Sequence, residues 1–304
     1  MKLLVLGSSA GGGFPQWNCN CNQCVGVRAG RSGLRTRTQS SIAVGGPQDW
    51  VLVNASPDLL LQIQRQPSLQ PARRLRDTGI AAVLLCDGQI DHTAGLVLMR
   101  ERATALPVWC TDPVYDDLTQ GNPVFRLLEH YCGVERHRID LRPDFFAIDG
   151  IADLRVRALA LISKPAPFSP HREAPVSGDN VGFVFENRAN GRRIFYAPGL
   201  AEVDAAVWDA MRTSDVVMVD GTFWTDDEMI RLGLLNKTGR QIGHLPQSGV
   251  GGMLECLARL PSATRKLLIH INNTNPILDE TSAERAACTR AGVEVCHDGL
   301  EIEL

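Results

Sequence analysis

Four polar residues lie close together in the stretch CDGQIDHTAGL, at the point where an apolar run ends. They are Asp87, Gln89, Asp91 and His92. Carboxylate and imidazole groups at such short spacing suit a divalent first-row metal such as iron, manganese or zinc. The same pattern is also compatible with Asp91 acting as the N-cap of a following helix. The stretch is therefore a candidate metal site, with helix capping as the alternative.

Three cysteines lie within a short segment near the N-terminus, at Cys19, Cys21 and Cys24. Thiolates at this spacing converge on one ion when the backbone folds tightly around it, and soft sulfur ligands favour Zn²⁺. The alternative is a set of free thiols that oxidise easily. We expect a structural zinc site, whose tetrahedral geometry requires a fourth ligand from elsewhere in the chain.

Three further polar residues come at or near the ends of apolar segments. His270 follows the run LLI and precedes several asparagines, Asp220 ends the run VVMVD, and His244 lies in the loop GHLPQSG. Site carboxylates in layered α/β proteins often occupy strand ends. Each residue also has an ordinary interpretation: a hydrogen-bonded structural histidine, a turn aspartate, or a loop residue that caps a helix. The residue types alone leave both interpretations open.

Short apolar runs bounded by turn residues predict the strands that position these groups. The predicted strands cover residues 2–7, 41–44, 50–55, 81–86, 154–161, 181–186, 193–197, 216–220, 266–271, 293–296 and 299–304. Periodic apolar patterns predict helices at 57–66, 93–104, 123–131, 201–212, 251–260 and 282–291. The segment 163–179 is rich in proline and polar residues, which predicts a long functional loop. No linker composition divides the chain, so we expect a single domain over residues 1–304.

The composition is that of an ordinary globular protein, with 44% hydrophobic and 21% charged residues. A net charge of −3 favours neither nucleic acid nor a membrane surface as a partner. The apolar run after Met1 is too short for a signal peptide, and no run is long enough to span a membrane. The cysteines number nine, and this odd count favours reduced thiols or metal ligands over disulfides. We therefore expect a cytoplasmic protein.

Taken in order, these segments resemble the metallo-β-lactamase superfamily, which carries an HxHxDH motif after a buried strand and a final histidine at a later strand end. Here Asp87 and Gln89 stand in place of the first two motif histidines, and Pro198 in place of a bridging aspartate. The stretch GSSAGGGFPQWNCNCNQC, with DHTAGL, DGTFW, GHLPQSG and HINNTNP, resembles more narrowly the branch that acts in biosynthesis of the coenzyme pyrroloquinoline quinone (PQQ). This narrower resemblance covers essentially the whole chain.

The resemblance implies an α/β fold, the αβ/βα four-layer sandwich, in which two mixed β-sheets pack face to face and are flanked by helices. The site should lie at one edge between the sheets. Because two motif histidines and the bridging aspartate are replaced, the ligands that remain are Asp91, His92 and His270. One carboxylate and two imidazoles resemble the facial triad of non-haem iron oxygenases, so Fe²⁺ is the expected active-site metal.

The resemblance also implies a reaction, the Fe²⁺- and O₂-dependent hydroxylation of the tyrosine ring in a cross-linked Glu–Tyr intermediate of PQQ biosynthesis. Other PQQ biosynthesis proteins are then candidate partners. His244 is a candidate acid/base, and the other candidate catalytic groups are Asp220, Asp87 and Gln89. Basic residues in loops are candidates for binding the substrate carboxylates, namely Lys164, Arg172 and Lys237.

The same resemblance bears on the three-cysteine zinc site. In a related phosphodiesterase branch, a histidine three residues after the final site histidine is the fourth zinc ligand, and Asn273 occupies that position here. Asn273, a water or another group would complete the zinc site. Two other functions remain as alternatives: a zinc-dependent hydrolase of the phosphodiesterase type, and a non-catalytic carrier of the finished quinone.

Overall fold

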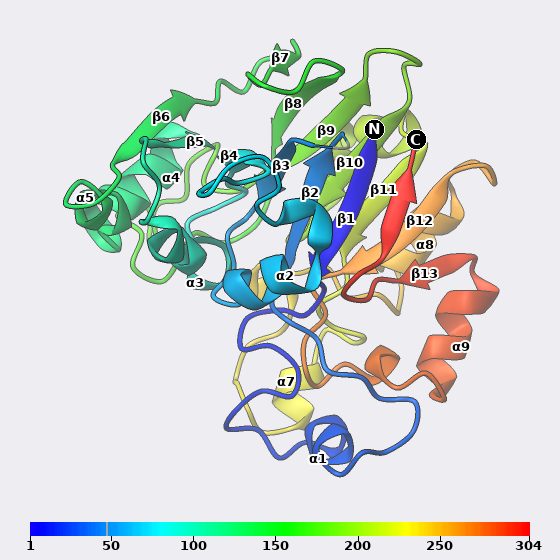
Figure 1. The fold of residues 1–304 in the computed structure, drawn as a ribbon. Helices are drawn as coiled ribbons and strands as arrows, with labels where there is room; N and C mark the ends of the chain where they lie inside the picture. Colours follow the sequence, from blue (N-terminus) through cyan, green and yellow to red (C-terminus); the bar gives the residue numbers. More distant parts are fainter. Residues whose placement is uncertain (47) are drawn as a thin grey trace.

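The computed structural model describes residues 1–46 and 48–304, and in that part of the chain two mixed seven-stranded sheets pack face to face (Figure 1). The first sheet has the order β14-β1-β2-β3-β4-β5-β6. Its strands are β1 (Lys2–Gly7), β2 (Ser41–Gly45), β3 (Trp50–Val53), β4 (Ile80–Leu84), β5 (Leu106–Cys110), β6 (Val134–Arg138) and β14 (Glu301–Glu303). The last strand pairs with the first, so both ends of the chain lie in one sheet.

The second sheet has the order β13-β12-β11-β10-β9-β8-β7. Its strands are β7 (Phe146–Ala147), β8 (Leu154–Ala160), β9 (Val181–Asn187), β10 (Arg193–Ala197), β11 (Val216–Asp220), β12 (Arg265–Ile269) and β13 (Val293–Val295). Pairs from β14 to β3 and from β7 to β10 are antiparallel, while those from β3 to β6 and from β10 to β13 are parallel. The two halves of the chain therefore repeat one strand-pairing pattern.

Apolar side chains form three layers that hold the sandwich together. The central layer lies between the sheets and includes Val53, Phe183 and Tyr196, all fully buried. The outer face of the first sheet packs against α2 (Leu59–Arg65), α4 (Asp112–Asp116) and α5 (Val124–Leu128). The outer face of the second sheet packs against α6 (Ala205–Arg212), α8 (Met253–Ala258) and α9 (Ala283–Arg290). Helix, sheet, sheet and helix layers confirm the fold that the resemblance implied.

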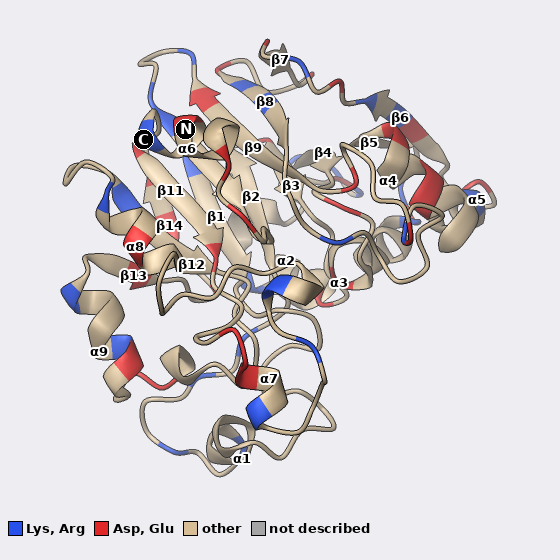
Figure 2. Cartoon of the chain, turned by 180° about the vertical axis from the view of Figure 1, so that it is seen from behind, with Lys and Arg blue, Asp and Glu red and all other residues tan. Residues whose placement is uncertain are grey.

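Two short helices lie beyond the ends of the strands. Helices α1 (Asn22–Arg28) and α7 (Glu228–Arg231) occur together below the sheets in Figure 1 and again in Figure 2. Figure 2 also shows basic and acidic residues interspersed over the coloured chain, in keeping with the small net charge. None of the described helices is long and apolar enough to cross a membrane.

Some element predictions were wrong. The helix predicted at 93–104 begins earlier, as α3 (Ile90–Thr93), and continues as a 3₁₀ helix, η2 (Ala94–Met99). Its N-cap is Gln89, so Asp91 does not cap it. Strands β5, β6 and β7 were missed because β5 contains a proline, β6 has the polar sequence VERHR, and β7 is very short. Partners in the sheet, and not local pattern, decide these segments.

Candidate metal centres

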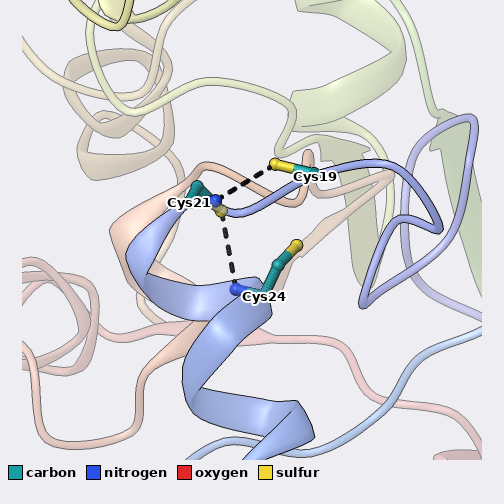
Figure 3. A group of neighbouring side chains, drawn as sticks. All are labelled: Cys19, Cys21 and Cys24. Atoms are coloured by element: carbon teal, nitrogen blue, oxygen red, sulfur yellow. Dashed lines mark hydrogen bonds between the residues drawn. The ribbon is translucent and has the colours of Figure 1, made fainter.

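The three cysteines predicted to bind zinc come together at the start of α1. Their sulfur atoms all lie within 4.8 Å of one another. The backbone N–H of Cys21 donates to Sγ of Cys19 at 3.4 Å, and that of Cys24 donates to Sγ of Cys21 at 3.5 Å. Figure 3 marks both hydrogen bonds with dashed lines. Cys21 thereby also caps the helix. These N–H donors favour thiolates, which are the form that binds metal.

Asn273 reaches the same cluster from the opposite end of the chain. Its amide nitrogen lies 3.1 Å from Sγ of Cys19, 3.3 Å from that of Cys24 and 3.7 Å from that of Cys21. A half-turn of this amide would present Oδ1 to the sulfurs in place of nitrogen. The structure thus places the residue expected at the fourth ligand position beside all three thiols.

Without a metal ion, burial and the neighbouring thiols make ionisation of Cys21 unfavourable. Burial and the neighbouring thiols raise the pKa of Cys21 to about 12. Burial also acts to raise the pKa of Cys19, but hydrogen bonds from Cys21, Cys24 and Asn273 leave that pKa lowered. Thiolates this close together repel one another, and a divalent cation removes that repulsion. The donor set fits zinc.

A second cluster contains Asp91, His92 and His270, whose ligand atoms also lie within 4.8 Å of one another. Nε2 of His270 is 3.2 Å from Oδ2 of Asp91, and Nε2 of His92 is 3.8 Å from the same oxygen. Nε2 of His92 is buried and has no hydrogen-bond partner among the described residues. A buried, unpartnered nitrogen facing a carboxylate is the arrangement expected of a metal ligand, so this donor set fits one divalent cation.

Two distant strand ends bring this cluster together. Asp91 and His92 lie in α3, just after β4, and His270 directly follows β12. His270 has a φ of 60°, a left-handed conformation that costs a non-glycine residue about 1–2 kcal/mol. The next residue, Ile271, is held by backbone hydrogen bonds with Ser8 and Ala10. The N-terminal loop therefore holds Ile271 in place, and Ile271 in turn fixes the strained backbone of His270.

The glycine-rich stretch after β1 covers Asp91 closely. A Cβ added to Gly11 would lie only 3.2 Å from Oδ2 of Asp91, which is tighter than ordinary van der Waals contact. Glycine at this position lets the N-terminal loop approach the carboxylate. The same loop continues to the three cysteines, so it contacts both clusters.

Asp87 supports His92 and does not face the cluster of ligand atoms. Its two carboxylate oxygens lie 2.8 and 2.9 Å from Nδ1 of His92, so that ring nitrogen donates outward and Nε2 points inward. Burial acts to lower the pKa of His92, but the carboxylates of Asp87 and Asp91 raise it to about 9. Gln89 is half-buried, and its amide nitrogen lies 3.5 Å from the carbonyl oxygen of Lys164. These two motif positions therefore have different surroundings.

The predicted acid/base residue His244 forms a pair with Asp220. Oδ2 of the fully buried Asp220 lies 2.7 Å from Nδ1 of His244. Burial acts to lower the pKa of His244, but the Asp220 carboxylate leaves it raised. Sequence reasoning missed Thr222, whose hydroxyl oxygen lies 3.1 Å from Nδ1 of His244 and 3.0 Å from Nδ1 of His270. Its position within DGTFW, two residues after Asp220, was the available signal.

The remaining predicted positions lie around these groups. Pro198 follows β10 in a segment without a carboxylate, as the sequence indicated. Lys164 and Lys237 are exposed, whereas the guanidinium of Arg172 donates to the carbonyl oxygen of Pro165. Of the candidate basic residues, Lys164 is tied most directly to the motif, through its carbonyl contact with Gln89.

The fold and the paired metal-ligand clusters define a protein of the metallo-β-lactamase class. The model of the beta-lactamase superfamily domain matches residues 49–271. Within that class, the chain belongs to the coenzyme PQQ synthesis protein B family. It is 57% identical over its full length to the coenzyme PQQ synthesis protein B of Azoarcus sp. and 53% identical to that of Methylococcus capsulatus, covering 100% of each relative.

Solved structures agree with this assignment. Zinc-bound PqqB from Methylobacterium extorquens is 36% identical and superimposes with a TM-score of 0.89, with 100% of both chains covered. A diphosphatase of the PhnP family has a TM-score of 0.70 at 19% identity, with 100% of this chain and 96% of that chain covered. The second likeness concerns the fold alone.

Proposed function

We propose that this protein acts in PQQ biosynthesis as an Fe²⁺- and O₂-dependent hydroxylase of the tyrosine ring in a cross-linked Glu–Tyr intermediate. The observation that carries the proposal is the donor set Asp91, His92 and His270, one carboxylate and two imidazoles around a buried, unpartnered nitrogen. Such a set holds one metal and leaves coordination positions open for substrate and O₂. The pathway comes from the names of the relatives that are 53–57% identical to this chain.

The reaction balances when one oxygen atom of O₂ enters the ring as a hydroxyl group and the other leaves as water, with two electrons from an external reductant and two protons. Asp91, His92 and His270 would hold Fe²⁺, which supplies redox chemistry that zinc lacks. Asp87 keeps the Nε2 atom of His92 directed inward, because both of its oxygens bind Nδ1. His244 and Asp220 form a hydrogen-bonded pair that is suited to take up a proton from the substrate.

Substrate binding is assigned to groups around the motif. The substrate carries several carboxylates, so the exposed amine of Lys164 is the best-placed of the basic candidates, since its own backbone contacts Gln89. Lys237 and Arg172 are the other candidates for binding carboxylates. Gln89 would contribute an amide at the rim of the metal site. The thiolate cluster would hold a structural zinc, with Asn273 or a water completing its coordination.

The test is metal analysis of anaerobically purified protein combined with an O₂-consumption assay on the cross-linked substrate. We expect one active-site iron per chain, one zinc at the cysteines, and substrate-dependent O₂ uptake that yields the ring-hydroxylated product. Two tightly bound active-site zinc ions with phosphodiester cleavage would instead establish the hydrolase. Tight binding of the quinone without turnover would establish the carrier.

A further inference from the structure

All three imidazoles near the candidate active site have their Nδ1 atoms occupied. Nδ1 of His92 contacts Asp87, Nδ1 of His244 contacts Asp220, and Nδ1 of His270 lies 3.0 Å from the hydroxyl of Thr222. The ring planes of His244 and His270 are nearly parallel, with centroids 5.4 Å apart. The Nδ1 atoms of these two rings thus share one hydroxyl group, because Thr222 also lies 3.1 Å from His244.

The tautomers of His92 and His244 follow directly from their partners. A carboxylate only accepts hydrogen bonds, so Nδ1 of His92 and Nδ1 of His244 must each carry a proton. A hydroxyl both donates and accepts, so the contact with Thr222 does not by itself decide the tautomer of His270. Another acceptor is needed to settle where the hydroxyl proton lies.

That acceptor is the backbone of His270. The Thr222 hydroxyl donates to the carbonyl oxygen of His270 at 2.9 Å, and a carbonyl oxygen cannot donate in return. The Thr222 hydroxyl has one proton, and that proton is already donated to the carbonyl oxygen. Toward the His270 ring, Oγ1 of Thr222 can therefore only accept a hydrogen bond. Nδ1 of His270 must then be the donor. Nε2 is then the nitrogen left for a metal ion, on the side that faces Asp91; without a metal, it can carry a second proton and donate to the Asp91 carboxylate at 3.2 Å.

Thr222 is itself held firmly. It is buried, and its backbone N–H donates to Oδ1 of Asp220 at 2.9 Å. Its carbonyl oxygen accepts from the backbone N–H of Asn272 and from the side chain of Asn275, each at 3.1 Å. One residue therefore contacts the His270 ring, the His270 carbonyl and the segment that follows. These contacts brace His270 in its left-handed conformation.

We propose that Thr222 is a positioning residue that fixes His270 in the tautomer whose Nε2 is free to bind the active-site metal. The proposal deepens the proposed function and rests on its assignment of His270 as a metal ligand. Hydrogen-bond partners of ligating histidines commonly change metal affinity by about 10- to 100-fold when they are removed. Thr222 should act in this range without touching metal or substrate.

The experiment compares Thr222→Val, which has nearly the same shape but no hydroxyl, with Thr222→Ser, which keeps the hydroxyl. Mn²⁺ affinity is measured by competition with a chelator, on protein whose cysteine site is zinc-loaded. We expect Thr222→Val to bind Mn²⁺ about 10- to 100-fold more weakly and Thr222→Ser to remain close to the unmodified protein. Zinc content and thermal transition report whether each variant is folded. Unchanged affinity in folded Thr222→Val, or an equal loss in Thr222→Ser, would overturn the proposal.

A second measurement tests the tautomer directly and needs no variant. Nitrogen-15 NMR of histidine-labelled protein without the active-site metal should show Nδ1 of His270 protonated, and an unprotonated Nδ1 would overturn the proposal. His270→Ala is measured in parallel for Mn²⁺. Retained binding in that variant would show that the ligand assignment of the proposed function is wrong. Lost binding in His270→Ala but not in Thr222→Val would remove only the role of Thr222.

Discussion

The thiolate cluster and the Asp91–His92–His270 cluster share one short segment of chain but differ in how they are built. Asn273 contacts the thiols, and His270 belongs to the second cluster only three residues earlier. The thiols come from one short segment, with Cys21 as the N-cap of α1 and Cys24 in the first turn of that helix, whereas Asp91 and His270 are separated by 179 positions. A site built locally stabilises that part of the fold, while a site assembled between two sheets depends on the whole fold.

The donor atoms of the two clusters also differ in how many hydrogen-bond partners they have. Each thiol sulfur lies near the side-chain amide of Asn273, and two of them also accept a backbone N–H. In the second cluster Nε2 of His92 has no partner among the described residues. A closed donor set is typical of structural zinc, and an incomplete one is typical of a metal that also binds substrate. The comparison predicts that one site supports stability and the other supports chemistry.

The largest expected effect is loss of the active-site metal. His92→Ala and His270→Ala should each abolish binding of that metal while leaving about one zinc at the cysteines, because each removes a ligand from a set of only three. Elemental analysis of purified protein measures both ions. His297→Ala, at an exposed histidine, is the matched control and should change neither. Full metal occupancy and turnover in either site variant would show that the residue is no ligand.

The next largest effect is on folding stability. Cys21→Ser should release the zinc and lower the melting temperature by roughly 10 °C, because the binding energy of a structural zinc is folding energy. The active-site metal should be lost only later, under conditions that begin to unfold the protein. Cys256→Ser, at a half-buried cysteine outside the cluster, should leave zinc content unchanged. A normal melting temperature with full zinc in Cys21→Ser would contradict the structural role.

An intermediate effect on metal affinity is expected at Asp87, which contacts Nδ1 of His92 and lies outside the set of metal-ligand atoms. Asp87→Ala should weaken metal binding about 10- to 100-fold, because Nδ1 of His92 loses its acceptor. Asp87→Asn keeps one acceptor oxygen and should lose less. Chelator competition measures both affinities. Equal affinities in the two variants would mean that charge, and not the hydrogen bond, is what Asp87 supplies.

A smaller effect is expected from restoring one imidazole of the superfamily motif. Gln89→His should allow a second, weakly held zinc at the active site and reduce oxygen chemistry, since imidazole suits zinc. Asp87 is left in place in this variant because it holds His92. Zinc titration with elemental analysis measures the stoichiometry. Unchanged stoichiometry would mean that residue 89 cannot reach the metal site.

The smallest expected effect is at Asp117, a buried carboxylate beside Gly88 that belongs to neither cluster. Burial raises its pKa to about 6, and the nearby charges of Asp179 and Asp87 act in the same direction. The folded state therefore holds this proton more tightly than the unfolded state, so stability falls as pH rises from about 4 to about 6. Asp117→Asn removes that penalty.

Asp117→Asn should raise the free energy of unfolding by about 1–2 kcal/mol at pH 7–8, and this increase should disappear below about pH 4. Urea unfolding at several pH values measures it. Asp149→Asn, at an exposed carboxylate, is the control and should show no such pH dependence. A loss of stability at neutral pH would mean that the Asp117 carboxylate is satisfied by a bound cation.

The sequence alone determined the residues of both clusters, because their types and spacing are local properties of a chain, and its resemblance to the metallo-β-lactamase superfamily implied the family and the sandwich of two sheets. Only the tertiary structure decided that Asp87 supports His92, that Thr222 joins His244 and His270, and that His270 is left-handed. It also decided strands β5 and β6, whose own residues give a weak pattern. The reason is physical: a hydrogen-bond partner or a neighbouring strand comes from elsewhere in the chain, and packing alone brings it into contact.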